Sequence, residues 1–512
     1  MTGARTAHKS PPFAKVLVAN RGEIAIRVMR GCRELGVRSV AVYSDPDRLA
    51  MHVRAADEAY ALGGATAAES YLRGDRIIEI ARQCGAEAIH PGYGFLAENP
   101  EFAQACADAG IVFVGPPPSA MRALGSKTSA RRVMQAAGVP VVPGTIDPIP
   151  TAEEAAEIAQ EIGFPIALKA VSGGGGKGMR VVERPEDLAN AFRQASDEAA
   201  AAFGDPTMYL ERLVVRPRHV EIQMLADQHG NALYLAEREC SVQRRHQKLV
   251  EEAPAPTVTP VLRAQMGEVA VRAAKAVGYT NAGTCEMLLD QSGEFFFLEV
   301  NARLQVEHPV TELVTGIDLV HWQLRIAAGE PLDFGQEDVQ LRGHAIECRI
   351  QAEDPYSRFF PSTGTVQALR EPAGPGIRID GALEPGTEVT PLYDSLLSKL
   401  VVWAEDRPRA LERMHRALGE YRVLGVRTTI PFHRWLMLHP PFVAGDLDTE
   451  MVARDWQPDG LLPEGVAEQA AILAALAEHL GGSRQHVGAA VTTADDPGRW
   501  LSFARRAGLR VP

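Results

Sequence analysis

Cysteine is scarce in this chain: it occurs six times in 512 residues, and no two cysteines form a C-x-x-C pair. This spacing is typical of neither a zinc ribbon nor a disulfide framework. Scattered, unpaired cysteines are usual in reducing compartments. We therefore expect reduced thiols and a cytoplasmic location.

Long hydrophobic runs are also missing, since no apolar stretch approaches the ~20 residues of a membrane span. The first twelve residues are polar and lack the apolar centre of a secretory signal. The formal net charge of −12 argues against a nucleic acid as the main ligand. We therefore expect neither a membrane nor a nucleic acid as partner, and the length predicts several globular domains.

Lysine is rare as well, with eight residues against 45 arginines. Four of the eight lie in the motifs described below: Lys127, Lys169, Lys177 and Lys248. A lysine ammonium is a compact point charge, for which arginine is no equivalent where that charge must meet a phosphate. The few lysines are thus concentrated where phosphate chemistry is expected.

The first folded part is predicted to be a Rossmann-like α/β domain. Residues 15–20 read as a strand, a helical pattern follows, and residues 37–43 read as the next strand. This β-α-β order predicts a parallel sheet. The Pro116-Pro117-Pro118 break indicates that the domain, residues 1–125, ends shortly afterwards.

Three further parts are expected. Residues 126–335 are predicted to be an α/β body, and about 140–215 of it to be a mobile lid with a helix at 152–162 and a strand at 165–170. Residues 336–456 contain many glycine and proline turns and are predicted to be a β-rich domain closed by a helix near 410–418. Residues 457–512 are predicted to form a helical tail.

The most informative stretch is residues 299–309 (EVNARLQVEHP), which combines carboxylates, amides and a guanidinium. Glu299, Asn301 and Arg303 alternate along it, so they share one face if the chain is a strand here. Such a face, rich in oxygen donors, is a candidate ligand site.

A partner strand for this stretch is predicted at residues 284–290, joined to it by a two-residue turn at Ser292-Gly293. A hairpin closed there places Glu286 directly opposite Glu299. Opposed carboxylates repel each other unless a cation lies between them. With Asn301 they would form an all-oxygen site that suits Mg²⁺ or Mn²⁺. An error in this register, with solvated glutamates at a sheet edge, remains the alternative.

A glycine loop occupies residues 172–179 (SGGGGKGM), directly after the strand that carries Lys169. Consecutive glycines let backbone amides wrap phosphate oxygens without Cβ clashes. No serine or threonine follows Lys177, so the loop is not a P-loop, and a flap over a nucleotide fits better. A purely structural glycine hairpin is the alternative.

Two other loops are candidates for ligand binding. Residues 244–254 (RRHQKLVEEAP) form a basic cluster with polar donors that could hold a planar anion such as bicarbonate, although a solvated basic turn is the usual meaning of such a run. Residues 90–99 (HPGYGFLAEN) follow a predicted parallel strand, at whose carboxyl end open sheets bind ligands. A structural turn is the alternative there.

Taken together, these motifs resemble the biotin carboxylase family, whose members are ATP-grasp enzymes. The resemblance covers about residues 14–440 and rests on seven stretches in order: 18–25 (VANRGEIA), 90–99, 173–179, 217–223 (PRHVEIQ), 244–254, 299–312 and 393–395 (YDS). It implies a Rossmann-like domain, an ATP-grasp body with a mobile lid and a β-rich C-terminal domain. It also implies that ATP and bicarbonate form carboxyphosphate, which carboxylates biotin on a carrier protein.

The resemblance also implies residue roles at the nucleotide. The implied phosphate ligands are Lys127, Lys169, Gly173, Gly174, Gly175 and Gly176. The implied adenine and ribose contacts are Glu211, Leu213, His219 and Gln243, with His246 at the nucleotide end of the basic cluster. The implied metal ligands are Glu286, Glu299 and Asn301, in agreement with the hairpin.

At the reaction centre, the implied bicarbonate pocket is made by Lys248, Arg303, Gln305 and Val306. Glu307 matches the base that deprotonates bicarbonate, which is a poor nucleophile until then. Arg349 matches the residue that stabilises the biotin enolate, and Tyr93 lines the biotin side. A guanidinium suits that role because it does not lose its own proton.

The chain departs from the family pattern at Lys177, where arginine is common, and beyond residue 457, where stand-alone bacterial subunits stop. The biotin carrier is expected on a separate chain, since no lysine here has a methionine neighbour. The predicted partners are that carrier, a second copy of the chain (a homodimer) and a carboxyltransferase subunit. We expect a subunit of an acyl-CoA carboxylase; the same subunit of a pyruvate or 2-oxoacid carboxylase and an inactive assembly scaffold are the alternatives.

The tail carries apolar residues on several sides of its predicted helix at 465–480, together with Trp500 and Phe503 further on. A lone surface helix would show one narrower apolar stripe. Aromatic side chains are common anchors in protein interfaces. We therefore expect the tail to dock a partner subunit, and packing onto the third domain is the alternative.

Overall fold

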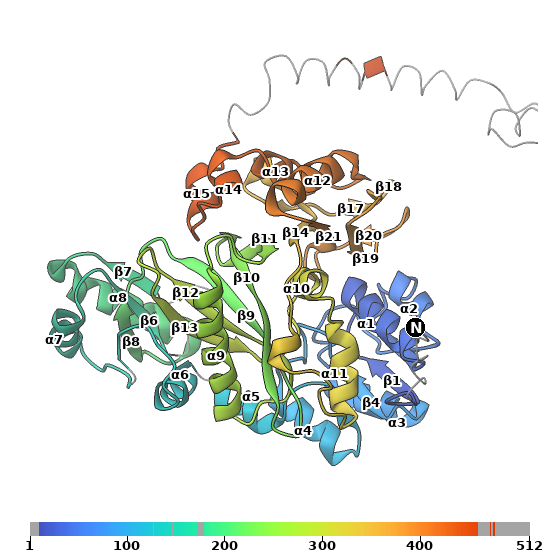
Figure 1. Ribbon diagram of the computed structural model, residues 1–512, viewed down its shortest axis with the longest axis horizontal. Coiled ribbons are helices and arrows are strands. Elements are labelled where there is room, and N and C mark those ends of the chain that lie inside the picture. Colours follow the sequence, from blue (N-terminus) through green and yellow to red (C-terminus); the bar gives the residue numbers. More distant parts are fainter. Residues whose placement is uncertain are drawn as a thin grey trace, which may run out of the picture. The chain divides into compact units, whose positions relative to one another are not determined.

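The structure is a computed structural model (Figure 1), and it describes residues 10–125, 127–145, 147–171 and 179–458, together with residues 472, 475 and 476. The chain divides into two units, Met1–Trp456 and Gln457–Pro512. The four loop glycines Gly173–Gly176 and nearly all of the predicted tail lie outside the described residues. The elements below belong to the first unit.

The N-terminal part is the predicted α/β domain with a parallel sheet. Its five strands run in the order β3-β2-β1-β4-β5, and every pair is parallel. The strands are β1 (Lys15–Val18), β2 (Arg38–Tyr43), β3 (Glu58–Ala61), β4 (Ala88–His90) and β5 (Val112–Phe113). The helices are α1 (Gly22–Glu34), α2 (Met51–Ala55), α3 (Gly74–Cys84) and α4 (Pro100–Asp108). Ile24, Val28 and Cys32 recur every four residues in α1, and all three are buried because they share one helix face.

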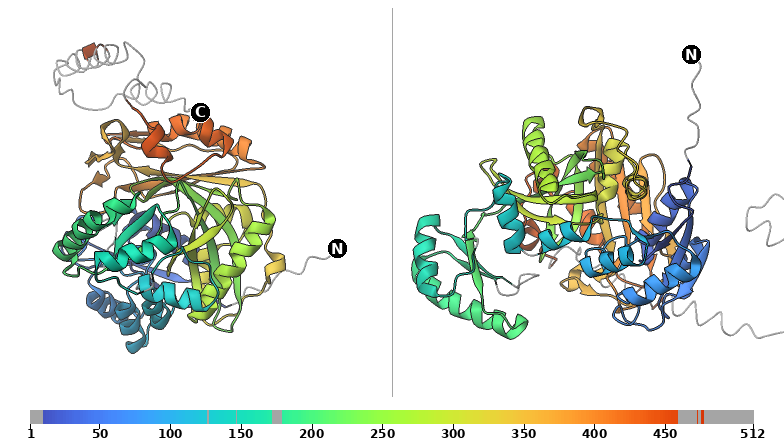
Figure 2. Two further views of the ribbon diagram at one scale, coloured as in Figure 1. Left: turned by 90° about the vertical axis from the view of Figure 1, so that its left-hand side faces the viewer. Right: turned by 90° about the horizontal axis from the view of Figure 1, so that it is seen from below.

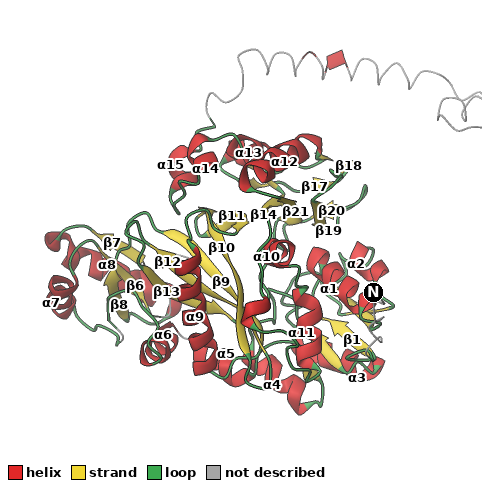
Figure 3. Ribbon diagram, in the orientation of Figure 1, coloured by secondary structure: helices red, strands yellow, loops and turns green. Residues whose placement is uncertain are grey.

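The body is built on an eight-stranded sheet with the order β13-β12-β9-β10-β11-β14-β21-β19, antiparallel throughout (Figure 3). The strands before residue 336 are β9 (Arg218–Ala226), β10 (Ala232–Arg244), β11 (Gln247–Ala253), β12 (Asn281–Leu289) and β13 (Phe295–Asn301). The strands after it are β14 (His344–Gln351), β19 (Ile377–Gly381) and β21 (Leu396–Ala404). The sheet therefore continues across the boundary that the sequence places at residue 336.

Helices surround this sheet and connect it to the N-terminal part. They are α5 (Pro118–Gly125), α6 (Lys127–Ala136), α9 (Pro260–Ala276), α10 (His308–Thr315) and α11 (Leu319–Ala327). α9 packs on β9 and β10, and α10 packs on β10, β11, β14 and β21. α10 thus begins beside the strands that carry most of the polar motif residues.

The lid segment forms its own small layer. Its sheet has the order β7-β6-β8 and consists of β6 (Ile166–Ala170), β7 (Met179–Val182) and β8 (Met208–Arg212). The helices α7 (Ala152–Ile162) and α8 (Leu188–Phe203) cover one face of this sheet (Figure 2). The helix predicted at 152–162 is confirmed, and the predicted strand at 165–170 is confirmed to within one residue.

The C-terminal part holds more helix than the sequence predicts. The helix expected near 410–418 lies within α12 (Arg407–Glu420), but it does not close the domain. The elements after it are β22 (Arg422–Leu424), α13 (Ile430–Leu436), α14 (Pro440–Ala444) and α15 (Met451–Asp455). The short strands before it are β15 (Glu353–Asp354), β16 (Phe360–Pro361), β17 (Gly364–Thr365), β18 (Ala368–Arg370) and β20 (Glu388–Val389). Helices of five to seven residues are too short to show a helical period in the sequence.

The described helices include none with the length and apolar character required to cross a membrane.

Trp456 ends the first unit and packs into an aromatic cluster. Its ring centroid lies 5.0 Å from that of Trp435 and 5.2 Å from that of Phe432, and its Nε1 donates to the Pro355 carbonyl at 3.1 Å. Only 8% of its surface is exposed. The short helices α13, α14 and α15 are therefore held on α12 and β14 mainly by apolar packing.

We predict that Trp456→Ala lowers the stability of the C-terminal part by about 3–5 kcal/mol, because it removes a large buried aromatic side chain. The check is the unfolding temperature measured by calorimetry, with Leu49→Ala as the control, since Leu49 is 80% exposed. A Trp456 variant that melts like the control would contradict this packing.

Candidate active site

The predicted β12–β13 hairpin forms, and Glu286 pairs with Glu299 across it. The predicted two-residue turn is wrong, because Leu289 pairs with Phe295 and residues 290–294 form the connection. The register shifts by one at a bulge on β13, where Leu298 is the additional residue. The longer connection and the bulge cancel, so the expected pairing is reached by a different route.

The two opposed carboxylates have different surroundings. Glu286 is 5% exposed, and its Oε1 accepts from Lys248 Nζ at 2.9 Å, Asn301 Nδ2 at 2.9 Å and Gln305 Nε2 at 2.8 Å. Glu299 is exposed and lines a cavity together with Lys169 and other residues of the lid. Glu299 and Asn301 also line a second cavity. The three predicted metal ligands are therefore close in the hairpin. Glu286 and Asn301 are buried and hydrogen-bonded to each other, whereas Glu299 is exposed.

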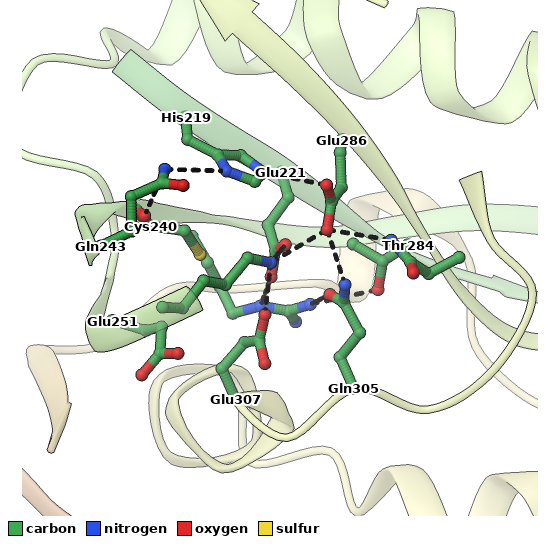
Figure 4. Close-up of polar contacts among 12 residues, drawn as sticks. His219, Glu221, Cys240, Gln243, Glu251, Thr284, Glu286, Gln305 and Glu307 are labelled. Atoms are coloured by element: carbon green, nitrogen blue, oxygen red, sulfur yellow. Dashed lines mark hydrogen bonds and ion pairs between the residues drawn. The ribbon is translucent and has the colours of Figure 1, made fainter. Parts of the chain in front are cut away.

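Lys248 is the centre of a buried polar cluster that contains Glu221, Glu286 and Glu307. Figure 4 labels these three carboxylates. Lys248 Nζ donates to Glu221 Oε2 at 2.6 Å, to Glu286 Oε1 at 2.9 Å and to Glu307 Oε1 at 2.6 Å. Burial alone would lower the pKa of Lys248, but the three carboxylates outweigh it and hold that pKa well above its usual value. The ammonium is therefore charged and uses all three of its protons in hydrogen bonds.

Arg238 is a second buried cation, which the motifs do not indicate. Its Nε donates to Glu221 Oε1, and its Nη2 donates to Thr284 and Gln305 at 3.1 and 3.0 Å. Its Nη1 donates to Gln223 at 2.6 Å and to Thr311 at 2.9 Å. Arg238 lies in β10, and a charge that is 0% exposed must be paired. In the sequence, the only indication of Arg238 is a run of three charged residues, 237–239, in a stretch that forms a strand.

Glu307 joins Lys248 to Arg349. It is the N-cap residue of α10, and its Oε2 accepts from Arg349 Nη2 at 2.8 Å. Burial would raise the pKa of Glu307, but Lys248, Arg349 and Arg238 outweigh it and hold the pKa well below its usual range. Arg349, on β14, also donates from Nε to Glu251 Oε1 at 2.6 Å. Glu307 is thus an ionised carboxylate between two cations.

Arg303 and Val306 flank this cluster along the same segment. Arg303 Nε donates to Glu98 Oε2 at 2.8 Å, and its Nη2 donates to Asn301 Oδ1 at 3.0 Å. The Val306 carbonyl accepts from Lys399 Nζ at 3.0 Å. Tyr93, in the loop after β4, has its ring centroid 5.8 Å from that same Nζ. The loop at 90–99 and the segment at 303–307 therefore meet.

His219 and Gln243 lie at the other side of the cluster. His219 Nε2 is 3.1 Å from Glu286 Oε2, and His219 Nδ1 is 3.4 Å from Gln243 Nε2. Burial would lower the pKa of His219, but Glu286 outweighs it, and the pKa is raised. His246 is exposed in the two-residue turn between β10 and β11, where it has a φ of +65°. The buried histidine, and not the exposed one, belongs to the cluster.

The predicted nucleotide residues of the lid form a separate group. Lys169 donates to Glu211, and Arg131 Nη1 donates to Glu211 Oε2 at 3.1 Å; the motifs did not indicate Arg131. The Leu213 amide donates to the Pro165 carbonyl at 2.9 Å. Lys169, Glu211 and Glu299 line one cavity. Lys127 is the first residue of α6, and its side chain lies outside the described residues.

Most of the chain matches known protein families. Residues 12–121 match "Biotin carboxylase, N-terminal domain", and residues 347–454 match "Biotin carboxylase C-terminal domain". Residues 126–334 match "Carbamoyl-phosphate synthase L chain, ATP binding domain". The three matches together account for nearly all of the first unit.

Individual relatives are similar to this chain over most of its length. A pyruvate carboxylase subunit of Methanothermobacter thermautotrophicus is 54% identical over 86% of this chain and 89% of its own length. Biotin carboxylase of a Nostoc species is 51% identical over 86% of this chain and 98% of its own length. The α subunit of methylcrotonoyl-CoA carboxylase from Dictyostelium discoideum is 50% identical over 87% of this chain and 64% of its own length.

Solved structures give the same result. The biotin carboxylase domain of Hydrogenobacter thermophilus 2-oxoglutarate carboxylase, a dimer in complex with MgADP and bicarbonate, has a TM-score of 0.82 at 49% identity, covering 86% of this chain and 97% of that one. Biotin carboxylase from Campylobacter jejuni has a TM-score of 0.83 at 46% identity, covering 86% and 99%. The fold predicted from the motifs is confirmed. The chain belongs to the biotin carboxylase family.

Proposed function

We propose that this chain carboxylates biotin on a separate carrier protein, using ATP and bicarbonate, as the first half-reaction of an acyl-CoA carboxylase. The observation that carries the proposal is the buried contact between Glu307, Lys248 and Arg349. It combines an ionised carboxylate with two fixed cations. The Glu286–Glu299 pair links these residues to the cavity lined by Lys169, Glu211 and Glu299, the nucleotide-type cavity. This is the arrangement needed to deprotonate a small anion and then transfer it.

Glu307 is the proposed base. An anion that binds Lys248 and Arg303 replaces part of the hydrogen bonds these cations now make with carboxylates. This displacement frees the Glu307 carboxylate to accept the bicarbonate proton. The flanking cations offset the charge that the deprotonated bicarbonate gains. Gln305 and the Val306 backbone would complete the pocket.

The proposed nucleotide site is the cavity lined by Lys169, Glu211 and Glu299, with Lys127 and the glycine loop at 173–176 as further phosphate ligands. Its donor set fits a hard divalent cation, because Glu286, Glu299 and Asn301 offer only oxygen ligands. Mg²⁺ or Mn²⁺ would be held by these three residues and would spread charge off the transferring phosphoryl group. His219 and Gln243 would hold the ribose, and His246 would reach the nucleotide from the exposed turn.

Arg349 is the proposed partner of the biotin enolate, with Tyr93 at the same side of the pocket. The Arg349 guanidinium is fixed by two carboxylates, because its Nε donates to Glu251 and its Nη2 donates to Glu307. Its pKa is lowered by burial but raised more strongly by these carboxylates, so it keeps its proton. A fixed guanidinium can then offset the negative charge that develops on the ureido oxygen.

We further propose that the final acceptor of the carboxyl group is an acyl-CoA. An acyl-CoA acceptor is supported by a relative that is a methylcrotonoyl-CoA carboxylase subunit. The relative that is named as part of a pyruvate carboxylase supports a pyruvate or 2-oxoacid carboxylase as the second candidate. In either case the proposed partners are a biotin carrier, a second copy of this chain and a carboxyltransferase subunit.

Two further proposals complete this picture. Residues 457–512 are the proposed docking segment for one of the partner subunits, consistent with their being a separate unit. A cytoplasmic location is proposed because all six cysteines are buried and unpaired.

The proposed division of labour between Glu307 and Arg349 is tested by two variants. Glu307→Gln is expected to lose bicarbonate-dependent ATP hydrolysis by about 10²–10³-fold, because it removes the base. Arg349→Ala is expected to keep part of that hydrolysis and to lose carboxylation of free biotin, because it acts after carboxyphosphate has formed. Phosphate release and fixation of labelled bicarbonate measure the two activities.

The unmodified protein is the reference for this comparison, and an inactive scaffold would show neither activity. Equal loss of both activities in both variants would show that the two residues do not act at different steps.

The proposed metal site is tested by Glu299→Gln. It leaves the hairpin register in place, since Glu299 is exposed, and it removes one of the two carboxylates. We expect ATP hydrolysis at ordinary Mg²⁺ to collapse and to recover partly as Mg²⁺ is increased. Glu294→Gln is the matched control, because Glu294 is an exposed residue in the connection of the same hairpin. Full activity of the Glu299 variant at low Mg²⁺ would sink the metal assignment.

A further inference from the structure

Lys399 is a buried lysine for which the proposed chemistry has no role. It lies on β21, and 0% of its surface is exposed. Its Nζ is 3.2 Å from Glu23 Oε2 on α1 and 3.7 Å from Asp380 Oδ2 on β19. It also donates a hydrogen bond to the Val306 carbonyl at 3.0 Å, and the centroid of the Tyr93 ring lies 5.8 Å away. Lys399 therefore joins the N-terminal part, the far end of the large sheet and the segment that precedes Glu307.

Val306 is the residue directly before Glu307, so its carbonyl belongs to the peptide group that leads into the proposed base. A rotation of this peptide would turn the Glu307 backbone and displace its carboxylate from Lys248 and Arg349. The neighbouring residues are fixed separately: Gln305 donates to Glu286 at 2.8 Å, and the Gln305 carbonyl lies 2.8 Å from His308 Nδ1. Among the described contacts, Lys399 is the group that fixes the Val306 carbonyl.

The cost of burying this ammonium is offset from two sides. Burial would lower the pKa of Lys399, but Glu23, Asp380 and the more distant Glu347 together outweigh it and raise the pKa. Asp380 is also held by Arg378, whose Nε and Nη2 lie 3.0 and 2.8 Å from its two oxygens. Of the two carboxylates in contact with Lys399, Glu23 is thus the one that depends on it more. Burial raises the pKa of Glu347, and Lys399 is also the charge that most lowers it. A change at Lys399 alone would leave Glu23 buried without its cation, which is costly by itself.

We propose that Lys399 is a positioning residue for Glu307 and acts through the Val306 carbonyl. On this inference, the N-terminal helix α1 supports the reaction centre by supplying Glu23 as the counter-charge that keeps Lys399 in place. The inference rests on the proposed role of Glu307 as the base. The competing explanation is that Lys399 and Glu23 form an ion pair that only stabilises the fold.

The two explanations are separated by Lys399→Met, Glu23→Gln and the double variant, with Lys275→Met as the control at an exposed lysine of α9. The double variant leaves neither Lys399 nor Glu23 as an unpaired charge, and this guards against loss of folding. The measurements are the unfolding temperature, kcat for bicarbonate-dependent ATP hydrolysis and KM for ATP. All are made on the full chain.

We expect the double variant to regain most of the unfolding temperature that Lys399→Met loses, while kcat stays about 10²-fold below the unmodified protein, as for a displaced catalytic group. KM for ATP should not change, because the described contacts of Lys399 involve no residue that lines the nucleotide-type cavity. Glu23→Gln keeps Lys399 but removes its counter-charge, so kcat should fall, though by less than in Lys399→Met.

A double variant with the kcat of the unmodified protein would overturn the inference and leave Lys399 a structural residue. Parallel recovery of kcat and unfolding temperature would do the same. If the unmodified protein itself shows no bicarbonate-dependent hydrolysis, the proposed function fails instead, so the two failures are distinguishable.

Discussion

The proposed reaction centre depends on one interaction, that of the buried Lys248 ammonium with three carboxylates. Three carboxylates meet at this one cation: Glu221 from β9, Glu286 from β12 and Glu307 from the start of α10. Without it, these carboxylates would repel one another in a medium that screens charge poorly. Arg238 contributes a second charge through Glu221 and Gln305. The charge balance therefore requires four strands and one helix terminus to meet in one arrangement.

Because the sheet is continuous, strands from both sides of residue 336 contribute side chains to this cluster. β11 carries Lys248 and Glu251, and it pairs directly with β14, which carries Arg349. The C-terminal part thus contributes its arginine to the site through a shared sheet and not through a separate domain face. The same sheet ends in β21 and β19, so Lys399 approaches the Glu307 segment from the same framework. Lys248 and Arg349, one for each proposed chemical step, are therefore held by the neighbouring strands β11 and β14.

The motifs in the sequence were sufficient to predict the family, the parallel N-terminal sheet and the pairing of Glu286 with Glu299. The turn of that hairpin was predicted wrongly, because a single sequence does not show that the bulge at Leu298 compensates for a longer connection. Arg238 was missed because its role comes from five side chains that are distant in the sequence. The short helices after residue 430 were missed because tertiary packing on Trp456 and Phe432, and not helical periodicity, stabilises them.

The claim that the Lys248 cluster is the catalytic centre is tested most directly by Lys248→Met. The measurement is ATP hydrolysis with and without bicarbonate, alongside nucleotide affinity by direct titration. We predict that bicarbonate stimulation falls by about 10²–10³-fold, because one charged donor to the reacting anion is lost. Nucleotide affinity should largely persist, because Lys169 and Glu211, which line the proposed nucleotide cavity, have no described contact with Lys248. A Lys248 variant that binds nucleotide and still responds fully to bicarbonate would contradict the account.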